Sequence, residues 1–258
     1  MVLRKVKNRI IQKILTSKRL AQPYKRFFKV QTEFLCPICN YSGPFMEILP
    51  ETGRRKHAQC PRCESLERHR IQRLVLDFVL MDKQPKSLSL LHFAPEECFR
   101  SYFKKLFGVY VTADLSGNRV DQKEDLTHLS FDNNSFDIVY ASHVLEHIKN
   151  DRKALSEIVR VLKPGGVAII PVPINGNKTI EYQEPNAHES YHFRCPGEDY
   201  YERYKSFFRD VKLYDSSNFD EKYQVYVYED RTKWPITMPL RSVTPGLRHK
   251  DIVPVCLK

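Results

Sequence analysis

The fold is decided by residues 136–172, which read FDIVYASHVLEHIKNDRKALSEIVRVLKPGGVAIIPV. The short apolar run 136–141 predicts a buried strand. Apolar positions recur at helical spacing over 151–162, and a Pro-Gly-Gly sequence then stops that helix. A second apolar run, 167–172, follows the stop. Strand, helix and strand in this order predict parallel strands joined by a crossover helix.

The same alternation begins upstream. A strand is expected over 87–94, a helix over 96–107 and a second buried strand over 110–115. Downstream, 211–214 and 223–228 are expected to form an antiparallel pair that closes one edge of the sheet. We therefore expect an α/β fold with a Rossmann-like, doubly wound sheet. Its ligand should lie beyond the carboxyl ends of the strands.

Four cysteines precede this alternation, in the pairs Cys36-Pro-Ile-Cys39 and Cys60-Pro-Arg-Cys63, with twenty residues between the pairs. This spacing is typical of a four-cysteine zinc site, in which four thiolates satisfy a tetrahedral ion and leave no open position. We expect a structural zinc ribbon, followed by a helix over 65–81. The chain has 7 cysteines in all. An odd count with paired C-x-x-C motifs favours a reducing, cytoplasmic location.

Positive charge is concentrated at the start of the chain. Residues 1–32 hold 10 of the 42 lysines and arginines and none of the 31 acids, so the other 226 residues carry 32 positive and 31 negative charges. A nearly neutral body weakens the case for a large nucleic-acid-binding face. The positive charge of residues 1–32, which we call the arm, therefore has to be explained separately from the nearly neutral rest of the chain, the body.

Within the arm, Leu3, Val6, Ile10 and Ile14 recur at helical spacing with basic residues on the other face. The sequence predicts a basic amphipathic helix, and Pro23 ends the segment. Two interpretations remain open. Residues 1–22 could lie on an anionic membrane surface, or the apolar stripe could pack on the rest of the protein.

No run approaches the roughly 20 apolar residues that a membrane-spanning helix needs, and no secretory signal is evident. The expected location is cytoplasmic, with peripheral attachment to the inner face of the membrane through the arm. The expected segments are the arm (1–32), the zinc ribbon with its linking helix (33–82), the sheet domain (83–230) and a C-terminal extension (231–258).

Polar side chains gather where the expected strands end. Asp114 ends the second strand, where a carboxylate can accept both hydroxyls of a nucleotide ribose. Asp125 follows a short stretch after it. His143 closes the third strand, and Glu146 and His147 lie in the turn beyond it. Because carboxyl ends of parallel strands share one edge, these side chains are expected to converge.

The sequence resembles the class I AdoMet-dependent methyltransferases, particularly the type 11 group. The resemblance is carried by DLTHLSFDNNSFD at 125–137, SHVLEH at 142–147 and VLKPGG at 161–166. The N-terminal part is similar to a subgroup with a zinc ribbon, through CPRCESLERHR at 60–70 and YHFRCPGEDY at 191–200.

The resemblance implies S-adenosyl-L-methionine as cofactor. The residues that it assigns to cofactor binding are His92, Ala94, Pro95, Glu96, Asp114, Leu115, Asp125, Leu126, Ser142 and His143. The first loop, HFAPEEC at 92–98, has none of the family's glycines, and Glu96 is expected to receive the cofactor's ammonium group. Only ten residues separate Asp114 from Asp125, so the sheet is expected to be abbreviated there.

The resemblance also implies that Glu146 and His147 face the transferred methyl group. His147 is expected to act as the base, with Glu146 positioning it or the substrate. His143 and His192 are the alternative candidates for the base. Substrate contacts are assigned to His188, Arg194 and Tyr200 after the fourth strand. The plainer alternatives are a surface ion pair for Arg194 and helix packing for Tyr200.

Three functions remain as alternatives. The first is O-methylation of a small molecule or of a sugar or glycan at or near the membrane. The second is RNA methylation with the ribbon and arm gripping RNA, which the neutral body disfavours. The third is a non-catalytic scaffold with a methyltransferase fold. The methyl acceptor and the oligomeric state are not encoded in any motif.

Overall fold

The fold is taken from a computed structural model, which describes residues 2–17, 20, 33–50, 53–230 and 247–258. Pro23 and most of the expected C-terminal extension lie outside the described residues. None of the helices in the described part of the chain combines the length and apolarity that a membrane span requires.

The chain divides into two compact units. The N-terminal unit is Met1–Leu74 with Ser216–Asp251, and the sheet unit is Val75–Asp215 with Ile252–Lys258. This division differs from the segments expected from the sequence. The reason is that both units are built from separated parts of the chain, and the last strand returns to the central sheet.

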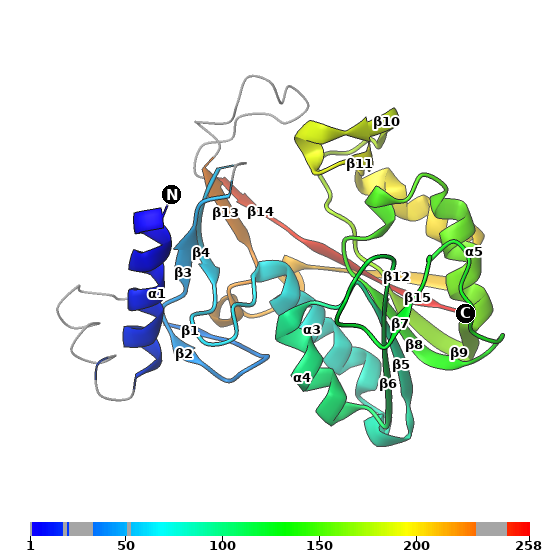
Figure 1. The fold of residues 1–258 in the computed structure, drawn as a ribbon, viewed down its shortest axis with the longest axis horizontal. Coiled ribbons are helices and arrows are strands. Elements are labelled where there is room, and N and C mark those ends of the chain that lie inside the picture. The colour runs from blue at the N-terminus through cyan, green and yellow to red at the C-terminus, as the bar shows by residue number, and fades with distance from the viewer. Residues whose placement is uncertain (1, 18–19, 21–32, 51–52, 231–246) are drawn as a thin grey trace. The chain divides into compact units, whose positions relative to one another are not determined.

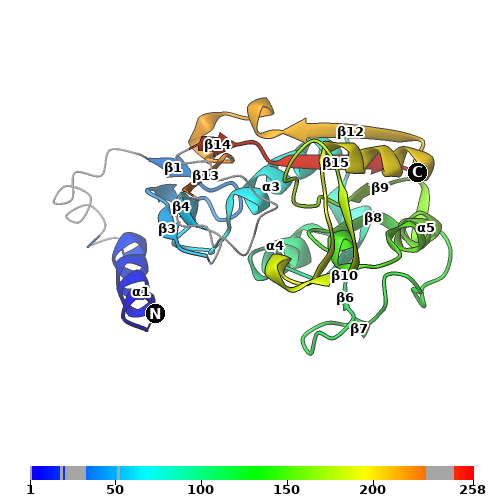
Figure 2. The same cartoon turned by 90° about the horizontal axis from the view of Figure 1, so that it is seen from above.

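Seven strands form that sheet, and the alternation of strands and helices predicted from the sequence is confirmed. Their order is β12 (Asp210–Asp215), β15 (Ile252–Leu257), β9 (Leu162–Ile169), β8 (Phe136–Ala141), β5 (Ser89–Phe93), β6 (Val109–Asp114) and β7 (Gln122–Lys123). Strands β9, β8, β5, β6 and β7 are parallel, while β15 is antiparallel to both of its neighbours. Figure 2 shows β12, β15, β9 and β8 one beside another.

The chain leaves the middle of this sheet in two directions. From β5 it runs through α4 (Glu97–Leu106) to β6 and then β7, and it returns to add β8, α5 (Asp151–Val161) and β9 on the other side. The strand order therefore reverses between β5 and β8, which is where open α/β sheets bind ligands. No helix joins β6 to the two-residue β7, as the short spacing there predicted.

Helices cover both faces of the sheet (Figure 1). On one face His92 and Tyr140 pack edge-on against Phe103 of α4. On the other face Leu91 and Val139, each one residue earlier, belong to the core formed with α5. Because strand side chains alternate between faces, this pattern gives the doubly wound arrangement.

One strand pairing predicted from the sequence is wrong. Strand β12, expected to pair with 223–228, pairs with β15 instead. In the N-terminal unit, β13 (Val227–Asp230) pairs with β4 (Arg54–Gln59) and with β14 (Leu247–His249). Strand β15 carries Val253 and Cys256, both fully buried, so burial favours its place between β9 and β12.

The remaining elements are short. In the N-terminal unit they are α1 (Val2–Thr16), β1 (Phe34–Leu35), β2 (Ser42–Gly43), β3 (Met46–Ile48), η5 (Ser216–Asn218) and η6 (Glu221–Tyr223). In the sheet unit they are η1 (Pro85–Ser87), η2 (Leu145–His147), β10 (Ile180–Asn186), η3 (Ala187–Glu189), β11 (His192–Cys195) and η4 (Glu198–Ser206). Helix α3 (Glu67–Leu80) contains the division between the units, close to its expected range.

Candidate active site

A crevice opens at the carboxyl ends of β5 and β6. Its volume is about 340 Å³, and its lining includes Ala94 and Pro95 after β5, Asp114 at the end of β6, and Gly117 in the following turn. This volume falls in the range of small-molecule sites. Three residues assigned to the cofactor from the sequence, Ala94, Pro95 and Asp114, therefore line one cavity.

Asp114 is held by the turn that follows it. Its Oδ1 atom accepts hydrogen bonds from the backbone N–H groups of Ser116 at 2.8 Å and Gly117 at 2.7 Å. A side chain at Gly117 would place its Cβ 3.0 Å from the Cβ of Asp114, so any larger residue there would crowd the Asp114 side chain. Among the described residues the Oδ2 atom has no hydrogen-bond partner, which leaves it available to ribose hydroxyls.

The turn after β5 has a backbone conformation that usually requires glycine, but it contains no glycine. Ala94 has a φ of 48°, in the left-handed region, and its N–H donates to the carbonyl of Ala113 at 2.8 Å. L-residues adopt this conformation at a cost that glycine avoids. The turn therefore has a backbone that glycine would favour, with a methyl group added at the crevice.

His92 does not reach the crevice, in contrast to its predicted cofactor contact. Its side chain is fully buried on the α4 face of the sheet. Its Nδ1 lies 3.0 Å from the Tyr110 hydroxyl and its Nε2 lies 2.8 Å from Oε2 of Glu96. One oxygen of Glu96 is thus engaged by His92, and the proposed ammonium contact of Glu96 stays a prediction.

The other assigned cofactor residues are not among those that line the crevice in the described part of the chain. Asp125 Oδ1 accepts hydrogen bonds from the N–H and hydroxyl of Thr127, each at 2.8 Å, so this carboxylate caps its own turn. Leu126 is 1% exposed and belongs to the core, Ser142 is buried, and Leu115 is exposed. Their contacts with a cofactor stay predictions.

The residues assigned to catalysis come together beyond β8. Ligand atoms of Glu146, His147 and His192 all lie within 4.8 Å of one another. The rings of His147 and His192 are 4.5 Å apart between centroids, at 88°. His143 Nδ1 lies 3.6 Å from Oε1 of Glu146. We call Glu146, His147 and His192 the His-Glu cluster.

The members of this cluster differ in exposure. Glu146 is 1% exposed and His192 is 8% exposed, whereas His147 is open to solvent. Partial desolvation still lowers the pKa of His147 below its usual range. Because His147 is the exposed member of the cluster, it is the one that can meet a bound substrate.

Arg194 holds the turn that carries two of these residues. Its guanidinium is 2% exposed. It donates hydrogen bonds to three backbone carbonyls around η2, those of Leu145 at 2.6 Å, Ile148 at 2.7 Å and Lys149 at 3.0 Å. Its Nε donates to Glu181 at 3.1 Å. With four donor contacts used in this way, Arg194 positions the turn at η2, and its substrate contact stays a prediction.

Tyr200 differs from its predicted substrate contact in the same way. It is fully buried, and its hydroxyl donates to Oδ2 of Asp151 at 2.8 Å. Tyr201 and Tyr204 pack beside it in the same core, so the alternative of packing is the observed one. His188 lies exposed in η3, and its substrate contact stays a prediction.

In the N-terminal unit the four cysteines form a second cluster. The Sγ atoms of Cys36 and Cys63 are 3.6 Å apart, as are those of Cys39 and Cys60, and all four lie within 4.8 Å of one another. Zinc–sulfur bonds of about 2.3 Å in a tetrahedron put the sulfurs about 3.8 Å apart. A disulfide needs about 2.05 Å. The observed spacing therefore fits one zinc ion.

Arg70, which sequence reasoning did not single out, lies fully buried in the same unit. It donates to the carbonyls of Ala58, Ser65 and Gln224 at 2.6–2.9 Å, and it stacks over the Phe45 ring at 4.3 Å. Desolvation lowers the pKa of Arg70, and the nearby acid and thiol groups counteract this. A tetrathiolate zinc site has net negative charge and would balance this buried cation.

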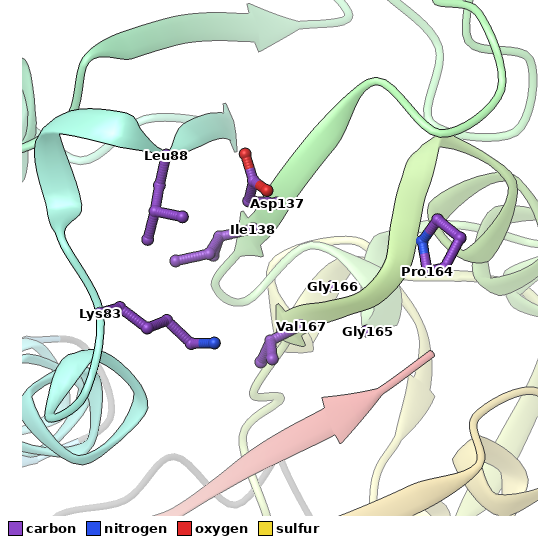
Figure 3. A pocket seen from close by; sticks show the side chains of 8 residues that line it. All are labelled: Lys83, Leu88, Asp137, Ile138, Pro164, Gly165, Gly166 and Val167. Atoms are coloured by element: carbon purple, nitrogen blue, oxygen red, sulfur yellow. The ribbon is translucent and has the colours of Figure 1, made fainter.

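A second, smaller cavity lies at the opposite edge of the sheet. Its volume is about 50 Å³, and Figure 3 shows Lys83, Leu88 and Ile138 pointing into it. It lies near the first residues of β8 and the Pro-Gly-Gly sequence in β9. This volume is well below the range of small-molecule sites, which begins at roughly 300 Å³, so the crevice beside Asp114 is the better candidate.

Comparisons with known proteins find similarity to methyltransferases. Residues 96–170 match the family model described as methyltransferase domain. A demethylmenaquinone methyltransferase of Clavibacter sepedonicus is 46% identical over 56 residues, 19% of this chain and 23% of that protein. The sterol 24-C-methyltransferase erg6 of Schizosaccharomyces pombe is 42% identical over 57 residues, 22% of this chain and 15% of that protein. The chain thus spans less than a quarter of the length of either.

Similar chains among solved structures have lower sequence identity. A putative methyltransferase of Bacillus halodurans has a TM-score of 0.43 and 16% identity, covering 71% of this chain and 98% of that one. A phosphoethanolamine N-methyltransferase 2 of Haemonchus contortus with S-adenosyl-L-methionine has a TM-score of 0.48 and 18% identity, covering 72% of this chain and 52% of that one. The segment of this chain that matches the methyltransferase domain, 96–170, contains Asp114, Glu146 and His147.

Proposed function

We propose that this protein is an S-adenosyl-L-methionine-dependent methyltransferase. The observation that carries the proposal is the crevice at the carboxyl ends of β5 and β6, with Asp114 in its lining, on the strand pair that adjoins the point where the strand order reverses. Oδ2 of Asp114 accepts the ribose hydroxyls, and the turn at Ala94 and Pro95 lies under the methionine end. The cofactor supplies a methyl group on a sulfonium sulfur, which is already a good leaving group.

The protein's remaining task is to align the acceptor and remove its proton. His147 is the exposed member of the His-Glu cluster. An acceptor hydroxyl gives its proton to the imidazole of His147. The acceptor oxygen would then take the methyl group that the bound cofactor supplies, and the electron pair of the carbon–sulfur bond would stay with sulfur. Glu146 and His192, both buried, orient the imidazole.

The acceptor that we propose is a hydroxyl of a small molecule or of a glycan at or near the cytoplasmic face of a membrane. Helix α1 supports a role for the arm at such a surface, since Arg9, Ile10 and Lys13 are exposed on it. Leu15 is 5% exposed and Gln12 donates to Glu64 at 3.0 Å. Part of the helix therefore packs on its own unit while the basic side stays open to anionic lipid.

The four-cysteine cluster holds a structural zinc ion in this proposal. The sulfur spacing and the buried Arg70 both support it. Because four thiolates leave no open position, this zinc stabilises the N-terminal unit and takes no part in methyl transfer.

The test is calorimetric titration of S-adenosylhomocysteine into the full chain and two variants. Asp114→Asn removes the charge that accepts the ribose hydroxyls, and binding should weaken at least tenfold, about 1.4 kcal/mol. Asp82→Asn is the control, since Asp82 is an exposed acid of the same unit that does not line the crevice. Absence of binding by the wild-type chain at millimolar ligand would refute the proposed function.

Membrane attachment is tested separately by flotation with vesicles that contain an anionic phospholipid. The wild-type chain should float with the vesicles, and replacing Arg9 and Lys13 together by glutamine should reduce that fraction, more so at low salt. Equal flotation of the two proteins would contradict a role for the arm.

A further inference from the structure

Strand β11 has two effects on the loop that follows β8. His192 and Arg194 are two residues apart on this strand, so their side chains leave it on the same side. His192 contributes its imidazole to the His-Glu cluster. Arg194 binds the carbonyls on both sides of Glu146 and His147. One strand thus supplies one member of the cluster and fixes the turn that carries the other two.

The three side chains make up a recognised ligand set. Two imidazoles and one carboxylate with further positions open form the facial arrangement that binds divalent first-row metals. Bonds of about 2.0–2.2 Å would place the three ligand atoms about 3.0–3.5 Å apart. All three lie within 4.8 Å of one another, with the two rings at 88°.

Burial of the carboxylate points in the same direction. Glu146 is 1% exposed, and a buried carboxylate is stable when it coordinates a cation. His143 Nδ1 lies 3.6 Å from its Oε1, and Arg194 fixes the backbone around it. Metal ligands are usually oriented by an outer layer of this kind, which holds each donor atom in place.

We propose that Glu146, His147 and His192 bind one divalent first-row metal ion. Metal binding at this cluster is inferred from these contacts alone. Its catalytic consequence rests on the proposed methyltransferase function. The acceptor oxygen would occupy an open position on the metal, which polarises the hydroxyl and favours loss of its proton to water. His147 is then a ligand, and the metal replaces the imidazole in activating the acceptor.

The test is a titration of Mn²⁺ followed by electron paramagnetic resonance, on the full chain loaded with one equivalent of zinc. Zinc occupies the four-cysteine site, and Mn²⁺ prefers imidazole and carboxylate to thiolate. The wild-type chain should bind one Mn²⁺. His147→Ala and His192→Ala should each weaken binding at least tenfold. His128→Ala, at an exposed histidine of the sheet unit with no assigned role, is the matched control and should bind like the wild type.

His147 is exposed, so its replacement leaves no cavity, and a thermal melt of each variant verifies folding. Equal affinity of the three variants would mean an adventitious ion only and would overturn the proposal. Absence of Mn²⁺ binding by the wild type would do the same.

Calorimetry with S-adenosylhomocysteine on the same samples separates the two proposals. Binding of Mn²⁺ without the nucleoside supports the metal site and refutes the methyltransferase. Binding of the nucleoside without Mn²⁺ refutes the metal site and leaves His147 as the proton acceptor.

Discussion

Replacing Arg194 by methionine should strongly destabilise the sheet unit. The guanidinium is 2% exposed and donates to three carbonyls, at 2.6, 2.7 and 3.0 Å. Hydrogen bonds to a charged group contribute about 1.5–3 kcal/mol each, and removal of one partner of a buried charged network costs about 3–5 kcal/mol. We therefore expect a loss of about 3–5 kcal/mol in the free energy of unfolding.

Urea denaturation and thermal melting measure this loss. For a unit of this size, about 2–4 °C per kcal/mol corresponds to a fall in Tm of roughly 6–20 °C. The matched control is Lys205→Met, which removes an ion pair of similar length, 2.7 Å to Glu202, whose side chains are 56% and 66% exposed. That change should cost less than about 1 kcal/mol. If Arg194→Met cost no more than Lys205→Met, the positioning role assigned to Arg194 would be wrong.

Three further predictions concern other parts of the chain. Cys60→Ser should lower the zinc content from about one per chain to well below one, by metal analysis, whereas Cys98→Ser, outside the four-cysteine cluster, should leave it unchanged; equal zinc contents would contradict the site. Ala94→Gly relieves a left-handed backbone that costs about 1–2 kcal/mol, but adds unfolded-state entropy worth about 0.5–1 kcal/mol, so the melt should show a net gain of up to about 1.5 kcal/mol. A clear loss would contradict the backbone assigned to that turn. Hydrogen bonds from Arg160 lower the pKa of Glu157, so its contribution is present above the ordinary glutamate pKa of about 4.3 and is lost as the pH falls below it. Glu157→Gln should therefore flatten the acid side of the stability profile, and an unchanged slope would contradict this.

The edge where the site lies could be predicted from the sequence because parallel strands place their carboxyl ends together. Asp114, Glu146 and His147 each follow a recognisable apolar strand, so their shared edge follows from chain direction alone. The four-cysteine site could also be predicted from the sequence, since the spacing of two C-x-x-C pairs is specific to metal sites.

Strand partners and buried polar residues could not be predicted in this way. Periodicity tells which side of a strand is apolar but not which strand lies beside it, so the pairing of β12 with β15 was missed. His92 and Tyr200 are polar residues that the fold buries, and Arg70 and Arg194 are charges that it buries against carbonyls. No local pattern in the sequence distinguishes them from exposed residues.

Calorimetric titration of S-adenosylhomocysteine into the zinc-loaded full chain tests the central proposal most directly. We expect one site per chain, with binding weakened at least tenfold in Asp114→Asn and unchanged in Asp82→Asn. A wild-type chain that releases no heat of binding at millimolar ligand, or an Asp114→Asn variant that binds as tightly as the wild type, would contradict it.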